Sequence, residues 1–191
     1  MRIHAMVVGL LLVSGLAACD DPNAGLFNPV IREDTVDLAA PLVDRATPTA
    51  LDVAYASSLI LGRFPELVAD AEQWDFAVRR EGGQLRLVPA GLFGFQNPVG
   101  GGSTATISLA LNEGIDEITR ASASRLDTII PVVLEQGEVY VVRSRRTNAA
   151  FGGCENYAKI QPLEVDAAAG RVKLRVVGNA RCNDPRLVAE D

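Results

Sequence analysis

The chain has 191 residues and carries 24 Asp and Glu against 18 Lys and Arg, which gives a formal net charge of −6. We therefore expect no nucleic acid partner, because binding nucleic acid needs a cluster of positive charge. The only histidine is His4, in a segment that we expect to be removed, so the mature chain cannot form a Ser-His-Asp triad or a His-ligated zinc site. We expect no catalytic residue, metal or cofactor, although this argument does not reach glycosidases that work with two carboxylates.

Near the N-terminus, the stretch Leu16-Ala17-Ala18-Cys19 follows an apolar run over residues 6–13. It resembles the lipobox of bacterial lipoprotein precursors. The resemblance implies a signal peptide over residues 1–18 and acylation of the Cys19 thiol. It also implies a lipid anchor on the periplasmic side of a bacterial membrane, with the inner and outer membranes both left open. The alternative is an ordinary secretory signal peptide, which would also export the chain and leave Cys19 as a free thiol.

Residues 19–49 are predicted to form an acylated N-terminus and an extended, partly disordered tether, because prolines interrupt them and they show no regular period. We expect a β-rich domain over residues 50–191. Within it, Leu51–Gly62 favours a strand. Phe64–Ala71 favours a short helix, because Pro65 suits a first helical turn.

The clearest β pattern begins at Trp74. Apolar and polar residues alternate over 74–79, Gly82 and Gly83 make a turn, and 85–88 returns, so we predict a hairpin with Asp75 on its polar face. Trp74 is either a core anchor or a ligand-stacking side chain.

After this hairpin comes a Gly- and Pro-rich loop over 89–102 that carries Leu92, Phe93 and Phe95. Long loops are often functional, so we consider a hydrophobic lid or binding tip, against the alternative that the aromatic rings fold back on the core.

Strand patterns continue towards the C-terminus. Residues 103–111 alternate, and 112–127 are ambiguous. Residues 129–134 and 138–145 predict a hairpin whose first strand Pro131 makes an edge or interrupted strand, and 157–165 with 171–177 predict a last hairpin. Arg143 and Arg145 share one face, which suits a solvated sheet surface. The predicted fold is mostly β: an antiparallel sandwich or barrel-like single domain with one or two short helices.

Two cysteines remain after Cys19. In an exported chain, a Cys154–Cys182 disulfide is the expected state, and two separate buried thiols are the alternative. The loop-closure entropy predicts that the bridge stabilises the folded state by about 3–4 kcal/mol.

Two stretches are similar to the HmuY-type haem-binding lipoproteins of bacterial envelopes. One is Trp74-Asp75-Phe76-Ala77-Val78-Arg79-Arg80, which resembles a strand of that family. The other is 157–161 with 171–175 beyond a Gly turn, which resembles the family's closing hairpin. The resemblance implies a ligand-binding lipoprotein. The family's best-known member holds haem iron between two histidines, and since this chain has none beyond His4, no iron ligand carries over.

These patterns favour a non-catalytic binding domain that takes an apolar ligand at Trp74, Phe93 and Phe95. The alternative is a structural or adaptor domain whose arginines 143, 145 and 146 meet an acidic envelope protein.

Overall fold

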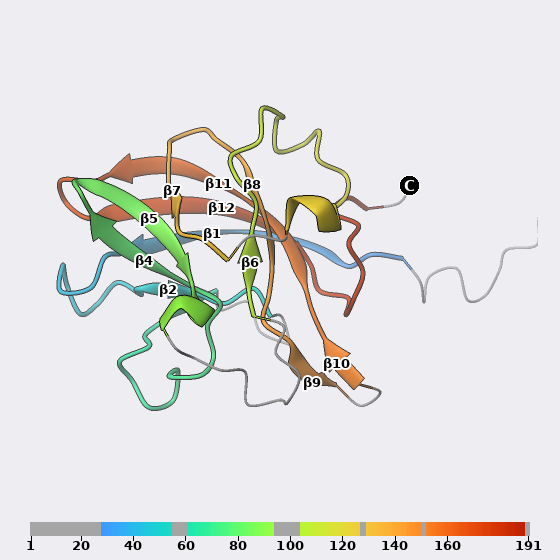
Figure 1. The fold of residues 1–191 in the computed structure, drawn as a ribbon, viewed down its shortest axis with the longest axis horizontal. Coiled ribbons are helices and arrows are strands. Elements are labelled where there is room, and N and C mark those ends of the chain that lie inside the picture. Colours follow the sequence, from blue (N-terminus) through green and yellow to red (C-terminus); the bar gives the residue numbers. More distant parts are fainter. Residues whose placement is uncertain (1–27, 55–60, 94–103, 127–128, 150–151, 190–191) are drawn as a thin grey trace, which may run out of the picture.

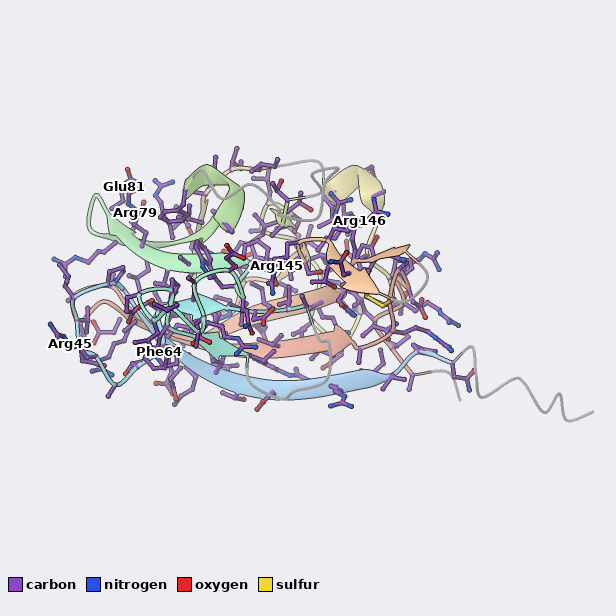
Figure 2. All side chains as sticks on the ribbon, turned by 90° about the horizontal axis from the view of Figure 1, so that it is seen from below. Arg45, Phe64, Arg79, Glu81, Arg145 and Arg146 are labelled. Atoms are coloured by element: carbon purple, nitrogen blue, oxygen red, sulfur yellow. A yellow bond between two sulfur atoms is a disulfide. The ribbon has the colours of Figure 1, made fainter. Side chains whose placement is uncertain are left out.

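The structure is a computed structural model that describes residues 28–54, 61–93, 104–126, 129–149 and 152–189. The predicted signal peptide, Cys19 and Phe95 lie outside these ranges. The fold is mostly β, with antiparallel sheets packed in a sandwich-like arrangement, as predicted (Figure 1). Seen at right angles, the blue and red strands of one sheet form one layer and the green strands of the other form the opposite layer (Figure 2).

The first sheet combines the two ends of the described chain. Its strand order is β1 (Ile31–Ala39), β12 (Arg171–Asn179), β11 (Tyr157–Asp166), β8 (Tyr140–Arg143) and β6 (Thr106–Ile107). The β11–β12 hairpin confirms the last predicted hairpin, and its turn contains Gly170 at a φ of 70°.

The second sheet comes from the middle of the sequence. Its order is β3 (Gly62–Arg63), β2 (Ala50–Leu51), β4 (Phe76–Glu81), β5 (Gln84–Pro89) and β7 (Val132–Val133). The β4–β5 pair confirms the hairpin predicted after Trp74. A separate two-stranded ribbon is formed by β9 (Thr147–Ala149) and β10 (Gly152–Cys154). The helices of the described ranges are two 3-10 turns, η1 (Ala90–Phe93) and η2 (Ala123–Arg125).

Apolar side chains fill the space between the sheets, and Phe76, Leu87, Ile160 and Leu174 are among the fully buried ones. A second cluster covers the other face of the first sheet and includes Ile118 and Leu187.

Lys159 of β11 ties this cover to the sheet. Its side chain is buried, and its Nζ donates a hydrogen bond of 2.9 Å to the Ile118 carbonyl. Burial lowers the pKa of Lys159.

The tether predicted over residues 19–49 is wrong where β1 lies. All nine residues of Ile31–Ala39 pair with β12. Val36 and Leu38 pack on the core, while Glu33 forms an ion pair with Arg175 of the neighbouring strand. Pro29 and Pro41, two of the prolines that had suggested a tether, flank β1 and do not interrupt it, and cross-strand charge pairs of this kind stabilise a sheet.

The helix predicted at Phe64–Ala71 is also wrong. The chain instead forms successive β-turns, with the Leu67 N–H donating to the Phe64 carbonyl and the Asp70 N–H donating to the Leu67 carbonyl. The Asp70 carboxylate accepts the Phe64 N–H at 3.0 Å, a local side-chain bond that competes with a helix.

The hairpin predicted over 129–145 is wrong as well, because its two strands belong to different sheets. β7 pairs with β5, and β8 pairs with β11 and β6. The chain crosses between the sheets after Leu134, whose N–H donates to the Leu85 carbonyl. β7 is an edge strand, as Pro131 predicted.

Two further predicted strands are only partly formed. In 103–111 the strand is confined to Thr106–Ile107, because the buried Ser108 hydroxyl accepts the Val141 N–H and Leu109 turns outward. In the stretch 51–62, Leu51 is the last residue of β2 and Gly62 is the first residue of β3. Residues 55–60 lie outside the described ranges.

Candidate ligand groove and buried charge network

Trp74 and Phe93 are brought together although they lie on different segments. Trp74 precedes β4, and Phe93 ends the 3-10 turn that follows β5. Their ring centroids are 5.5 Å apart with the planes at 74°, an edge-to-face contact. The Trp74 indole donates a 3.0 Å hydrogen bond to the Ala71 carbonyl, which fixes the orientation of the ring. Of the three predicted ligand-binding residues, two therefore meet, and Phe95 lies outside the described ranges.

The alternation pattern misplaced Trp74 with respect to the core. Phe76 and Val78 face the space between the sheets, whereas Trp74 packs in a small cluster with Ala50, Ala77 and Ala90. The backbone at 74–75 is irregular and breaks the period of two before β4 begins.

Trp74 and Phe93 both line an open groove of about 1030 Å³. This size is at the upper end of the range of small-molecule sites, which are mostly apolar with a few polar groups. The lining combines the 41–49 loop, the 64–67 turns, β4 and η1, as follows: Pro41, Leu42, Asp44, Arg45, Thr49, Phe64, Pro65, Glu66, Leu67, Trp74, Ala77, Val78, Arg79 and Phe93. Most of these side chains are apolar.

Two exposed arginines, Arg45 and Arg79, belong to this lining, and Figure 2 shows both at the same end of the molecule as Phe64. Within the described ranges neither arginine forms a hydrogen bond or an ion pair. The Asp44 carboxylate, by contrast, is occupied by Arg171 and by the Thr47 N–H. The hydrogen bond from the Thr47 N–H is the main cause of the lowered pKa of Asp44.

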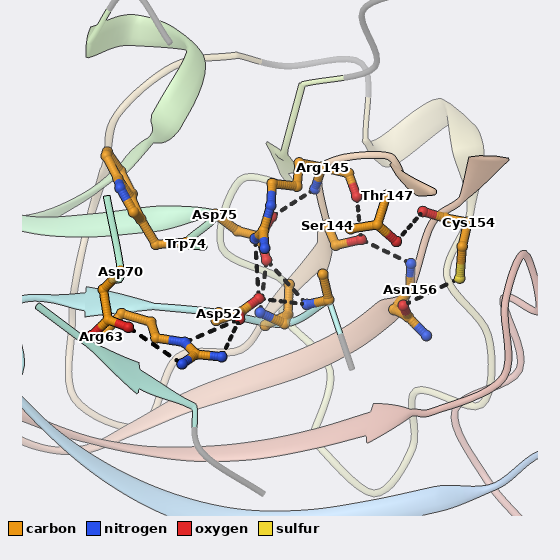
Figure 3. A network of polar contacts seen from close by, with 12 residues as sticks. Asp52, Arg63, Asp70, Trp74, Asp75, Ser144, Arg145, Thr147, Cys154 and Asn156 are labelled. Carbon is orange, nitrogen blue, oxygen red and sulfur yellow. Dashed lines mark hydrogen bonds and ion pairs between the residues drawn. The ribbon is translucent and has the colours of Figure 1, made fainter. Parts of the chain in front are cut away.

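A second polar arrangement lies inside the sandwich (Figure 3). Asp75 is fully buried, contrary to its predicted place on a polar face. One of its carboxylate oxygens accepts the N–H groups of Val53 and Ala54 at 2.7 and 3.1 Å. The other accepts the N–H of Arg145 at 2.7 Å and lies 3.1 Å from the Arg145 guanidinium.

The network extends from Asp75 to a second buried carboxylate. Asp52 binds Arg145 through one oxygen at 3.0 Å and Arg63 through the other at 3.0 Å. Burial, with the repulsion from Asp52 added to it, outweighs the attraction of Arg145 and raises the pKa of Asp75 to about 6. Because both carboxylates are buried and occupied by arginines and backbone N–H groups, this arrangement joins the second sheet to the segment after β8 and offers no open reaction site.

Arginines 143, 145 and 146, which were expected to form one adaptor surface, lie in three different environments. Arg145 turns inward, which corrects its prediction as a solvated residue. Arg143 lies 3.7 Å from the Glu155 carboxylate, and Arg146 is exposed beside Gly153. The period-two pattern ends at Arg143 with β8, so it does not extend to Arg145.

Cys154 and Cys182 lie at disulfide distance, with their sulfur atoms 1.98 Å apart and their Cα atoms 4.9 Å apart. The pair joins β10 to the C-terminal segment, as the sequence predicted.

Comparison with models of protein families, with curated proteins and with solved structures finds no match for this chain. The likeness to the HmuY-type family thus rests on the sequence stretches quoted above. No helix in the described part of the chain is both long enough and apolar enough to cross a membrane. The described residues also contain no group of His, Cys, Asp and Glu arranged to hold a metal ion.

Proposed function

We propose that this protein is an exported lipoprotein whose β sandwich binds an apolar ligand, without catalysis, in the groove lined by Trp74 and Phe93. The observation that carries the proposal is the edge-to-face pair of these two rings within a mostly apolar groove of about 1030 Å³. Phe93 keeps 43% of its surface exposed, and exposed apolar side chains beside a concavity are typical of a binding site.

The cellular setting of the proposal comes from the stretch Leu16-Ala17-Ala18-Cys19. An acylated Cys19 would hold the domain on the periplasmic side of a bacterial membrane. Stable anchoring generally takes more than one lipid chain, so we expect Cys19 to carry more than one acyl group.

A binding role without chemistry is supported by the place of the acidic groups. Asp52 and Asp75 are absent from the groove lining and are held by arginines inside the fold. The carboxylates that do line the groove, Asp44 and Glu66, lie on a loop and a turn, and the first is paired with Arg171.

The test is a titration of the full mature chain, carrying Cys19→Ser so that its own acyl groups do not compete, with the neutral probe 1-dodecanol. Trp74 is the only tryptophan, so its fluorescence reports on the groove directly, and calorimetry gives the dissociation constant. We expect saturable binding with one site per chain.

Phe93→Ala should weaken binding about tenfold, because truncating an aromatic contact costs about 1–2 kcal/mol. Leu92→Ala is the matched control: Leu92 is the adjacent residue of η1, is 48% exposed and does not line the groove. Absence of binding by the wild type, or equal losses in the two variants, would overturn the proposal.

A further inference from the structure

The groove that we propose as the ligand site carries charged side chains beside its apolar walls. Arg45 and Arg79 line it together with Trp74, and both side chains are exposed. Within the described ranges these two guanidinium groups lack any hydrogen bond or ion pair. A guanidinium presents five donors in a planar fork that fits a carboxylate or phosphate.

Arg79 also lies directly opposite Arg86 in the β4–β5 pair. Cross-strand neighbours point to the same face of a sheet, so like charges at these positions repel and destabilise the hairpin. The nearest carboxylate to Arg86 is Glu81, at 3.7 Å, and the buried Nε of Arg86 has no hydrogen-bond partner. This face therefore has more positive than negative charge next to the groove.

The acidic residues of the groove do not neutralise the positive charge of Arg45 and Arg79. Asp44 is occupied by Arg171, which is not part of the lining. The Glu66 carboxylate accepts a hydrogen bond from the Thr49 hydroxyl at 3.4 Å and has no cationic partner among the described residues. Within that part of the chain, the lining thus holds one carboxylate that lacks a cation and two arginines that lack an anion.

We propose that the ligand is an anionic amphiphile, with one apolar chain against Trp74 and Phe93 and one acidic head group bound by Arg79 and Arg45. This inference rests on the proposed function and specifies its ligand class. The apolar walls explain the chain, and the two arginines explain a head group that accepts charge-assisted hydrogen bonds. The bound head group also relieves the repulsion between Arg79 and Arg86.

Three probes with the same twelve-carbon chain test the head group: dodecanoate, 1-dodecanol and dodecyltrimethylammonium, each below the concentration at which it forms micelles. Calorimetry on the full mature chain with Cys19→Ser should show dodecanoate binding at least tenfold more tightly than 1-dodecanol at low ionic strength. The cationic probe should bind more weakly than 1-dodecanol. Added salt should reduce the preference for dodecanoate, since exposed charges are screened.

Substitutions then assign the preference to residues. Arg79→Gln and Arg45→Gln should each weaken dodecanoate binding several-fold more than they weaken 1-dodecanol binding. The double variant should lose the preference for dodecanoate over 1-dodecanol. Arg32→Gln is the matched control, because it removes the same charge from β1, outside the groove. Thermal unfolding of each variant shows whether it is folded.

The two proposals can fail separately. If 1-dodecanol and dodecanoate bind equally, or if Arg79→Gln and Arg45→Gln behave like Arg32→Gln, the anionic head group is overturned and the apolar site stands. Tighter binding of the cationic probe would likewise overturn it and assign the head group to Glu66. If none of the three probes binds, the proposed function itself fails.

Discussion

Arg145 contacts Asp75 twice through the same carboxylate oxygen, with its backbone N–H at 2.7 Å and its guanidinium at 3.1 Å. One residue of the segment after β8 therefore neutralises, and at the same time positions, a carboxylate that precedes β4 of the other sheet. A buried carboxylate is costly unless it is paired and hydrogen-bonded, and here backbone and side chain meet both needs.

Replacing an acceptor oxygen of the Asp75 carboxylate by an amide donor should destabilise the fold strongly, because both oxygens accept backbone N–H groups. In Asp75→Asn, the amide group turns a donor towards N–H groups that also donate, and Arg145 keeps only Asp52 as a partner. We expect a loss of about 3–5 kcal/mol in the free energy of unfolding, measured with urea. Asp70→Asn is the control, because Asp70 forms a longer ion pair of 3.4 Å with Arg63, and it should cost about 1 kcal/mol or less. Equal effects of the two variants would contradict this role of Asp75.

Asp75 should also make stability depend on pH in an unusual direction. Its pKa is about 6 in the folded state and about 3.9 in an unfolded chain. Between these values the folded protein binds more protons than the unfolded one, so stability falls as pH rises from about 4 to about 6 and is flat above. A shift of this size corresponds to about 3 kcal/mol. A ¹³C NMR titration of the Asp75 carboxyl group measures its folded pKa directly, and a value at or below 4 would refute the expectation.

The disulfide should stabilise mainly the C-terminal segment and the cover that it forms. Leu187 is buried against the first sheet, and its N–H donates to the Thr119 carbonyl at 2.8 Å. The double variant Cys154→Ser/Cys182→Ser should lose about 3–4 kcal/mol. Hydrogen exchange should become faster at Leu187 and remain slow in the β11–β12 hairpin. Two alkylatable thiols in the native wild-type protein would contradict the bridge.

The sequence was informative where pairing is local. The β4–β5 and β11–β12 hairpins were predictable because alternating residues and a glycine turn lie within one short stretch. β1 was not predictable, because it pairs with β12 far along the chain, where Glu33 meets Arg175. Likewise, nothing in the residues around Leu134 indicates that the chain changes sheets there.

For the site, the sequence pointed to Trp74 through its alternating strand and the family resemblance, and to Phe93 through the long apolar loop that contains it. The opposite wall of the groove was missed, because Leu42 and Phe64 lie in stretches interpreted as tether and helix. The buried pair of Asp52 and Arg145 is separated by 93 residues, and no spacing pattern reports a contact of that kind.

Leu42 gives a test of strain at the groove. It has a φ of 71° and is completely exposed, although a left-handed conformation costs a residue with a side chain about 1–2 kcal/mol. Leu42→Gly should raise stability by up to about 1 kcal/mol, because glycine removes this cost but has more freedom in the unfolded chain. Leu42→Ala keeps the strain and should be near neutral, as calorimetric unfolding would show. Both should weaken 1-dodecanol binding, and a Leu42→Gly variant less stable than Leu42→Ala would contradict the argument.

Substitutions at two turn glycines allow the energetic cost of backbone strain to be measured apart from the cost of steric crowding. A Cβ on Gly170, at a φ of 70°, would lie 2.7 Å from Val43 Cγ2, whereas a Cβ on Gly82, at a φ of 59°, would meet nothing within 4 Å. Gly82→Ala should therefore cost about 1 kcal/mol from strain alone, and Gly170→Ala about 2–4 kcal/mol. Urea denaturation of the two variants measures the difference. Equal losses would show that the 41–49 loop yields to the added methyl group.

The pairing of β1 with β12 sets an order in which the protein can fold. The hydrogen bond from the Val30 N–H to the Asn179 side chain closes a loop of 149 residues, and β12 is the only strand that β1 pairs with in the described sheets. While the chain is being made, β1 has no strand to pair with in the first sheet until β12 has emerged. The β4–β5 hairpin can form early, but the first sheet cannot be completed before residue 179 is available. Contacts this distant in sequence slow folding, so we expect the β1–β12 pair to form late, after the local hairpins.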